Sequence, residues 1–323
     1  MWFKLFTLGM AGASVCLSST VVSAAESDKG FIEDSTTSVG LRNFYWNADN
    51  RNGSYRNPEG ERQSFRQEWA QGVLAKFNSG YTQGLIGFGV DLHYMGALKL
   101  DGGNGRVGDG IGNGGIVARD NQGEPKSGYS KAGGAVKMRV GQTELAYGDL
   151  FPDSPVLKYG DIRLLPQTLR GFNVTDRSLD GLTLNAGRFV SSSDRAQPNH
   201  GGHLGTAYSG RQADSEFVSY YGGIYTGVNN LKIKLFGSEL DDIWNQQFAS
   251  LDYRLPLTVG GVVNTGVNYY RTRNTGAALL GDIRNDAWSA RAGYALGGHK
   301  FELAYTQIDR SEERRVGKEG PRG

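Results

Sequence analysis

The chain has almost no cysteine: Cys16 is the only one among 323 residues. It lies in the first 24 residues, which we expect to be removed, so the remaining chain can form neither disulfides nor a thiolate metal site. Histidine is also scarce, with four residues, and no apolar run long enough for a spanning helix follows residue 24. These absences exclude a disulfide scaffold and a helical membrane protein.

Glycine and aromatic residues are abundant instead. The 49 glycines do not follow a G-X-Y period, so a collagen-like chain is excluded. The chain also has 16 Tyr, 14 Phe and 5 Trp, whereas disordered chains are poor in aromatic residues. What remains is a large, mostly β protein.

Both ends of the chain are set apart from the fold. Residues 1–24 contain one lysine, a short apolar stretch and the small residues Val22-Ser23-Ala24, which together predict a secretory signal peptide. The segment 310–323 resembles a translated sequencing-adapter oligonucleotide, so we expect an artefact or a disordered tail. Between them, 25–309 holds 29 Lys and Arg against 30 Asp and Glu. This balance disfavours a nucleic-acid partner, which needs a net basic face.

The strongest pattern along the chain is an alternation of period two. In 84–98 the even positions Ile86, Phe88 and Leu92 are apolar, and the odd positions are small or polar. Because successive side chains of a strand point to opposite faces, such segments are two-faced strands. We predict about twelve of them, near 37–47, 64–78, 83–98, 130–140, 142–149, 179–190, 214–225, 229–239, 246–255, 261–273, 286–296 and 299–308.

Two all-β architectures fit this alternation. A soluble sandwich buries its apolar face, whereas a transmembrane barrel turns that face to lipid and lines its lumen with the polar one. Short turns that alternate with long polar loops favour the barrel, as do aromatic strand ends and basic residues in mid-strand. We therefore predict a transmembrane antiparallel β-barrel of the porin type.

Several segments carry a family resemblance in consistent order from about residue 30 to 309. They include LRNFYWN (41–47), YSKAGGAVKMRV (129–140), RLLPQTLRGF (163–172) and longer runs at 80–102, 237–257 and 269–296. Together they resemble the OprD-type outer-membrane porins, also called outer-membrane carboxylate channels.

The resemblance implies a monomeric barrel of eighteen strands in the bacterial outer membrane, in contact with lipid and lipopolysaccharide. In that family an external loop folds inward to narrow the pore, and a ladder of basic side chains guides small anionic or zwitterionic solutes such as amino acids, small peptides and organic acids. About twelve strands within 25–309 would then be a partial barrel, so we expect a fragment.

The segment 150–178 is the expected constriction loop. It contains Pro152, Pro155 and Pro166 and lacks the alternation, and proline cannot donate to a β-ladder. A mobile external loop is the plain alternative, but its aliphatic residues favour packing against a wall. The resemblance makes it the inward-folded loop, with Arg163 presented to the pore.

The expected pore-lining residues come from two sources. The resemblance points to Arg66, to Arg42 in the retained Leu41-Arg42-Asn43 motif and to Tyr208, while a later ladder arginine of relatives is replaced by Ala48. The alternation adds Lys137, Arg139 and Arg188, each of which could instead form a salt bridge within the wall. Acidic residues could contact a substrate ammonium, orient arginines or lie in loops; they are Asp161, Glu239, Asp241 and Asp242.

Other functions have weaker support. An outer-membrane barrel enzyme and a soluble exported glycan-binding domain stay open as alternatives, although no hydrolase motif occurs at a strand–helix turn. His200-x-x-His203 has no further His or Cys ligand nearby. We therefore expect no catalytic residues, no cofactor and no metal site.

Overall fold

The computed structural model describes residues 30–49, 55–56, 62–63, 65–102, 115–120, 125–198, 200–208, 211–258 and 260–309. The predicted signal peptide 1–24 and the tail 310–323 lie outside these residues. No helix long and apolar enough to cross a membrane occurs in the described part. Its strands are β1 (Thr36–Asp49), β2 (Tyr55–Arg56), β3 (Arg62–Gln63), β4 (Phe65–Asn78), β5 (Ile86–Asp101), β6 (Gly128–Val140), β7 (Thr143–Leu150), β8 (Thr168–Leu179), β9 (Leu182–Ser193), β10 (Leu204–Tyr208), β11 (Arg211–Ser215), β12 (Val218–Tyr225), β13 (Leu231–Leu240), β14 (Trp244–Pro256), β15 (Val262–Asn274), β16 (Arg284–Leu296) and β17 (His299–Ile308).

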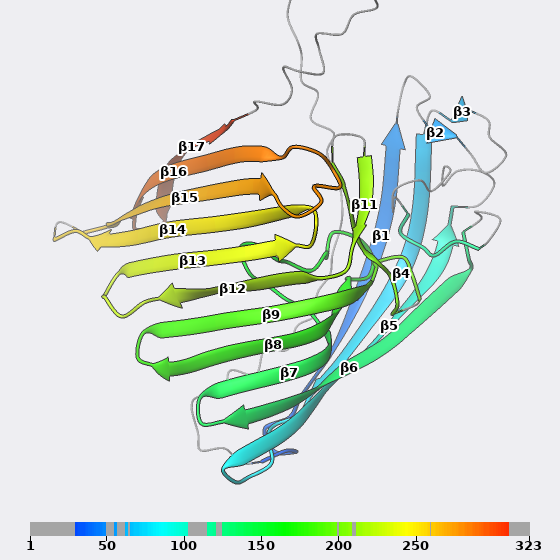
Figure 1. Cartoon of the computed structure of the whole chain (residues 1–323), viewed down its shortest axis with the longest axis horizontal. Helices are drawn as coiled ribbons and strands as arrows, with labels where there is room; N and C mark the ends of the chain where they lie inside the picture. Colours follow the sequence, from blue (N-terminus) through cyan, green and yellow to red (C-terminus); the bar gives the residue numbers. More distant parts are fainter. Residues whose placement is uncertain are drawn as a thin grey trace, which may run out of the picture.

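Thirteen of the strands form one antiparallel sheet in the order β1-β4-β5-β6-β7-β8-β9-β12-β13-β14-β15-β16-β17. Each strand therefore pairs with the next one of this sheet along the chain, and the sheet curves into a trough (Figure 1). Two small hairpins, β2–β3 and β10–β11, stand apart from it. Among the described residues no pairing joins β17 to β1.

The structure corrects the strand count, because the predicted loop 150–178 ends earlier than expected. β8 begins at Thr168, which leaves a loop of residues 151–167. The alternation of β8 is obscured because the register shifts between Arg170 and Gly171, and again between Asp176 and Leu179. Each shift moves side chains to the other face, so no continuous period-two pattern is visible in the sequence.

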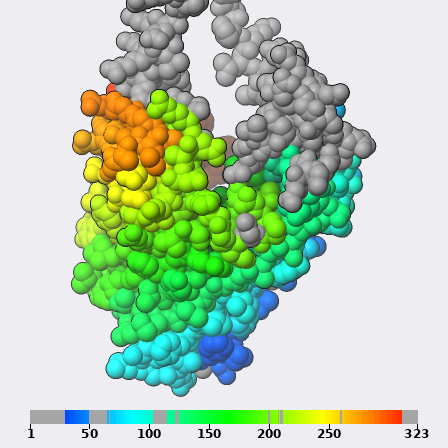
Figure 2. Space-filling model, turned by 45° about the vertical axis from the view of Figure 1, so that its right-hand side comes forward, coloured from blue at the N-terminus to red at the C-terminus, as the bar shows by residue number. Residues whose placement is uncertain are grey.

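The two faces of the sheet have the predicted character. On the outer face, Ile86 is 45% exposed, Phe88 55% and Val136 61%. Lys137 and Arg139 lie on the opposite, inner face, which the loops cover. Figure 2 shows the side chains of neighbouring strands as a continuous wall, from cyan near the bottom to orange at the upper left. A soluble sandwich would bury these apolar residues, so the outer face suits lipid.

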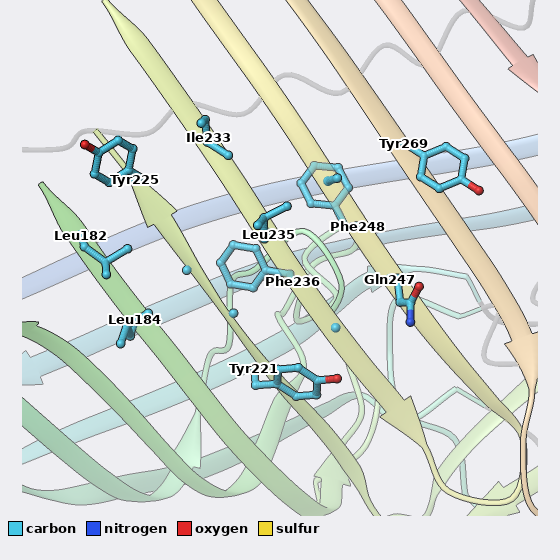
Figure 3. A pocket seen from close by; sticks show the side chains of 14 residues that line it. Leu182, Leu184, Tyr221, Tyr225, Ile233, Leu235, Phe236, Gln247, Phe248 and Tyr269 are labelled. Atoms are coloured by element: carbon cyan, nitrogen blue, oxygen red, sulfur yellow. The ribbon is translucent and has the colours of Figure 1, made fainter. Parts of the chain in front are cut away.

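An apolar furrow of about 600 Å³ lies on the outer face between β9, β12, β13 and β14 (Figure 3). Leu182, Leu184 and Leu235 line it, and Tyr221 lies across Gly237. A Cβ atom at Gly237 would lie 2.9 Å from the Tyr221 ring, so glycine makes room for the flat aromatic side chain.

The inner face is buried in two places. Residues from β4, β5 and β6 form one apolar cluster with Leu164 and Leu165 of the loop 151–167. A larger cluster lies over β8 to β14 and is centred on Phe189, Phe236 and Phe248. Because both clusters lie on the face opposite the exposed apolar residues, the interior of the trough holds packed loops.

We predict that Val136→Arg lowers the free energy of unfolding in phospholipid vesicles by about 2–4 kcal/mol, because it places a cation in the apolar outer band. Asn185→Arg on the inner face is the matched control and should have a much smaller effect. Equilibrium unfolding in guanidinium, followed by tryptophan fluorescence, measures both. Equal losses for the two variants would contradict the assignment of the faces.

Candidate functional site

The loop 151–167 joins β7 to β8 and lies against the inner face of the first strands. Leu164 and Leu165 are fully buried there, among Ala70 of β4 and Met95 of β5. A Cβ atom at Gly72 would lie 3.1 Å from the Leu164 side chain, so the loop approaches the strand backbone closely. The aliphatic residues that favoured packing over a mobile loop are thus the ones that anchor it.

The other part of the loop reaches the far wall of the trough. Val156 and Leu157 pack against the second apolar cluster, and the Tyr270 hydroxyl of β15 donates to the Pro155 carbonyl at 3.2 Å. The loop thus contacts both the early and the late strands of the sheet. Such a loop crosses the interior and narrows it.

Arg42 on β1 holds the early-strand end of this loop. Its Nη1 donates to Asp161 Oδ1 at 2.6 Å and to the Arg163 carbonyl at 2.9 Å, and its Nη2 donates to Asp161 Oδ2 at 3.3 Å. Both side chains of the ion pair are less than 35% exposed. The predicted pore-lining Arg42 is therefore committed to positioning the loop.

Aromatic contacts fix the side chains along the loop. The Arg163 guanidinium lies 4.2 Å from the centre of the Trp46 ring on β1. The Phe151 ring packs edge-on against the rings of His93 and Tyr159, with 5.1 Å and 5.3 Å between ring centres. The Lys76 ammonium lies 4.0 Å from the centre of the Phe151 ring. Arg163 and Lys76 thus bring two cations to the loop, each resting on an aromatic face.

Tyr159 in the middle of the loop is a neutral group. Burial, followed by the nearby Asp161 and Asp153 carboxylates, raises the pKa of the Tyr159 phenol above its ordinary value. Its hydroxyl therefore stays protonated at neutral pH and adds no negative charge to the loop.

Lys131 on β6 is a buried cation that the sequence did not single out. It is 3% exposed, and its Nζ donates to the carbonyls of Pro166 at 2.9 Å, Asp194 at 2.8 Å and Ser193 at 3.4 Å. One ammonium thus joins the end of the loop 151–167 to the segment that follows β9. Its position in the alternation marked it as inward-facing, but nothing in the sequence named its partners.

Glu68 on β4 anchors a second inward segment, residues 115–120. Its Oε2 accepts hydrogen bonds from Ile116 N at 2.7 Å and Val117 N at 3.3 Å, and the carboxylate is 1% exposed. Ile116, Val117 and Ala118 are buried in the first cluster. The short apolar run after a glycine-rich stretch was the available signal for this segment.

Asp149, on the inner face at the end of β7, is another buried charge. Its two carboxylate oxygens accept from Arg170 Nε and Nη2, each at 2.9 Å, and His200 Nδ1 lies 3.4 Å away. His203 lies instead near Asp214, at 4.0 Å. The described residues contain no group of three or more His, Cys, Asp or Glu that could hold a metal.

The predicted ladder residues near the short turns of the sheet have partners in the wall. Lys137 Nζ donates to Asp91 Oδ1 and to the Ser79 carbonyl, both at 2.7 Å. The Arg139 guanidinium lies 4.5 Å from the centre of the Tyr81 ring. Arg66 lies instead at the opposite end of β4 from the turn after Asn78: its backbone pairs with Ala48 of β1, and its side chain lies outside the described part.

One predicted residue, Arg188, lies on the opposite face from the expected one. Arg188 pairs with Phe172 and Ser219 across neighbouring strands, is exposed, and shares the outer face with Val190; its guanidinium lies 3.7 Å from the Phe217 ring centre. The expectation that Arg188 faces the interior is therefore wrong. Tyr208 ends β10 of the separate hairpin and packs against the larger apolar cluster.

The acidic residues mostly satisfy local groups. Asp161 binds Arg42, and Asp242 Oδ1 accepts from Ala277 N at 2.8 Å in the turn after β13. Asp241 lies in the same turn, and Glu239 is in β13. Asp161 is thus paired with a cation of the wall and is not free to contact a solute ammonium.

The arrangement is a loop held across the inner face of the sheet, with no catalytic constellation among the described residues. A proline-containing loop crosses the interior, buried charges fix its backbone, and cations lie at its edge. Such a site can select small solutes by size and by charge.

Comparison with known proteins gives a family match over most of the chain. A family model described as "outer membrane porin, OprD family" matches residues 29–320. Porin D of Pseudomonas aeruginosa is 38% identical over 308 residues, which cover 95% of this chain and 66% of Porin D. The chain spans 66% of the length of the curated relatives it matches.

Solved structures agree with this match. OccK9 (OpdG) of Pseudomonas aeruginosa has a TM-score of 0.75 at 36% identity, over 87% of this chain and 69% of that one. OpdK of Pseudomonas aeruginosa, solved with vanillate, has a TM-score of 0.73 at 31% identity, over 86% and 68% of the two chains.

We predict that Arg42→Gln lowers the free energy of local opening of the loop by about 1–2 kcal/mol, because partly buried charge-assisted hydrogen bonds are lost. Hydrogen exchange at residues 160–165 measures the change. Lys158→Gln removes an exposed ion pair with Asp153 in the same loop and is the control. Unchanged hydrogen-exchange rates in Arg42→Gln would show that the buried leucines Leu164 and Leu165 hold the loop in place without this ion pair.

Lys131→Met is expected to lower the free energy of unfolding by about 2–3 kcal/mol, since buried carbonyls lose their donor. Lys126→Met, at an exposed position just before β6, should change it by less than about 0.5 kcal/mol. Chemical denaturation in detergent micelles compares the two. An unchanged free energy of unfolding in Lys131→Met would argue that the hydrogen bonds of Lys131 do not stabilise the fold.

Proposed function

This chain belongs to the OprD family of outer-membrane porins, and we propose that it forms the selective part of a narrow pore for small solutes that bear a carboxylate. Its relatives are channels, and its place is the bacterial outer membrane. The porin-type β-barrel fold predicted from the alternation is confirmed by these relatives. Neither a barrel enzyme nor a soluble glycan-binding domain has support among them.

The observation that carries the proposal is the loop 151–167 lying across the inner face, with Arg163 on it. The loop is fixed at Arg42 of β1 and at Tyr270 of β15, so it narrows the interior from wall to wall. Arg163 lies on the Trp46 ring of β1, and Lys76 of β4 lies on the ring of Phe151 at the start of the loop. A solute that passes this loop meets cations in a confined space.

Confined cations favour carboxylates for a physical reason. A cleft lined by one sign of charge focuses the field and raises the local concentration of counter-ions. Arginine also stays charged and pairs with carboxylates through its planar fork. Transport further needs weak binding at several places, so that the solute can leave.

The solute class is amino acids, small peptides or organic acids. The relative OpdK was solved with vanillate, an aromatic carboxylate, and this lends the class support. Arg66, Lys137 and Arg139 are further candidates for the basic ladder, with Arg163 as its best-placed member. Arg188 is left out because it lies on the outer face.

The outer wall is proposed to contact lipid and lipopolysaccharide in a monomeric barrel. Exposed aliphatic and aromatic residues cover that face from β1 to β17, among them Leu41, Leu92, Leu235 and Leu303. The constriction lies inside a single chain, so selectivity needs no residue of a second copy.

We predict that Arg163→Gln reduces the preference for a carboxylate anion over K⁺ about fivefold, the factor for losing an interaction of about 1 kcal/mol. Reversal potentials across planar bilayers, with potassium glutamate gradients and protein extracted from outer membranes, measure the ratio. Raising the salt concentration should shrink the difference, because the field is screened.

Arg163→Lys keeps the charge and should retain most of the preference. Arg188→Gln is the matched control, since it removes an arginine from the outer face. The proposal fails if Arg163→Gln and Arg188→Gln behave alike, or if the unaltered protein shows no conductance.

A further inference from the structure

Three cations stand together on the inner face, away from the constriction loop. Lys232 and Lys234 lie on β13 and Arg254 lies on β14, near the short turn 226–230. Their strand positions match that of Phe236, whose burial in the interior cluster fixes the inward direction of β13. In such barrels short turns lie at the periplasmic rim, so these cations lie at the periplasmic mouth.

Within the part of the chain that the structure describes, these three side chains have no hydrogen-bond or ion-pair partner. Asp252 is directly opposite Lys232 across β13 and β14, but its carboxylate accepts from Arg291 Nη2 at 2.6 Å. Glu302 of β17 is paired with Lys300 at 2.8 Å. Lys232, Lys234 and Arg254 therefore carry three positive charges that the neighbouring acids do not neutralise.

This contrasts with other inner cations of the sheet. Arg42, Lys131 and Lys137 each donate to carboxylate or carbonyl oxygens of the protein. Leaving like charges next to one another on one strand face is unfavourable. A bound anion would relieve this repulsion.

A cavity of about 420 Å³ lies at the same place. Its lining includes two of the three cations, Lys232 and Arg254, but not Lys234. Arg291, Asp252, Asn229, Asn230 and Asn264 also line it. Lysine, arginine and asparagine supply N–H donors, and only Asp252, already held by Arg291, brings a negative charge. The cavity thus has the volume, the charge and the donors for a small oxyanion.

We propose that Lys232 and Arg254, which line this cavity, form a second binding site together with Lys234, the next inward residue of β13. The site would take a small multivalent oxyanion such as inorganic phosphate or a dicarboxylate. Two or more oxygens of one ligand can be bound at once by adjacent cations, so a dianion is held more tightly than a monocarboxylate. Arg254 offers a planar fork and the two lysines offer point charges, a combination typical of phosphate recognition.

The site is independent of the proposed solute class at the constriction. It lies on β13 and β14, whereas Arg163 and Lys76 lie at the loop over β1 and β4. Static binding can therefore be measured without transport. Failure of the permeation test would leave this site standing, and the reverse also holds.

The test is titration of the full chain in detergent micelles with inorganic phosphate and with succinate, followed by calorimetry at low ionic strength. Acetate and chloride are the monovalent comparisons. We expect phosphate and succinate to bind at least about tenfold more tightly than acetate, and Lys232→Gln/Lys234→Gln/Arg254→Gln to lose at least about tenfold of that affinity.

Two further variants keep the result interpretable. Arg271→Gln removes an exposed cation from the outer face of β15 and should leave binding unchanged. Lys232→Arg/Lys234→Arg preserves the charges and should retain binding even if the triple variant folds poorly. Equal affinity for acetate and phosphate, or loss of binding in Arg271→Gln as well, would overturn the proposal.

Discussion

The inner face of this sheet uses charged side chains to hold the backbone of the loops that cross it. Where a loop is buried against the wall it loses contact with water, so its N–H and C=O groups there need partners from the protein. Lys131 supplies donors to three carbonyls, and Glu68 accepts from two amides. Arg42 donates to a carboxylate and to a backbone carbonyl of the loop 151–167. Without these contacts the interior would have no fixed narrow point, and the cations at the loop edge would have no defined position.

The same contacts divide the inner charges into two groups. Arg42, Lys131 and Lys137 are occupied by protein oxygens, whereas Lys232, Lys234 and Arg254 have no partner among the described residues. Counting basic residues on the polar face therefore overestimates how many of them meet a solute. Whether a basic residue is paired matters more than how many there are, because a charge that is already paired adds little to the electric field in the interior.

Much of the wall could be predicted from the sequence, because the alternation in strands such as β5 and β6 is long and uninterrupted. The inward loop could also be predicted, since three prolines and several aliphatic residues share one segment. β8 could not, because register shifts at Arg170 and Asp176 break its pattern. Arg188 was misplaced because alternation alone does not say which face of β9 points inward. Phe189 is buried inside under the loops, and Arg188 lies outside, over the Phe217 ring. The partners of Lys131 and Glu68 depend on contacts between distant segments, which no local pattern encodes.

The loop that joins β7 to β8 touches both β1 and β15, and this has a consequence for assembly. Its contact with Arg42 closes a separation of 119 residues, and its contact with Tyr270 closes one of 115. Contacts between such distant residues form slowly, since chain entropy opposes them until nearer pairings exist. The crossing segment can settle only after the strands on both sides have paired and curved toward each other. The docking of this loop onto the inner face is therefore a late step of folding, and a sheet that has not yet bound the loop would have an open interior.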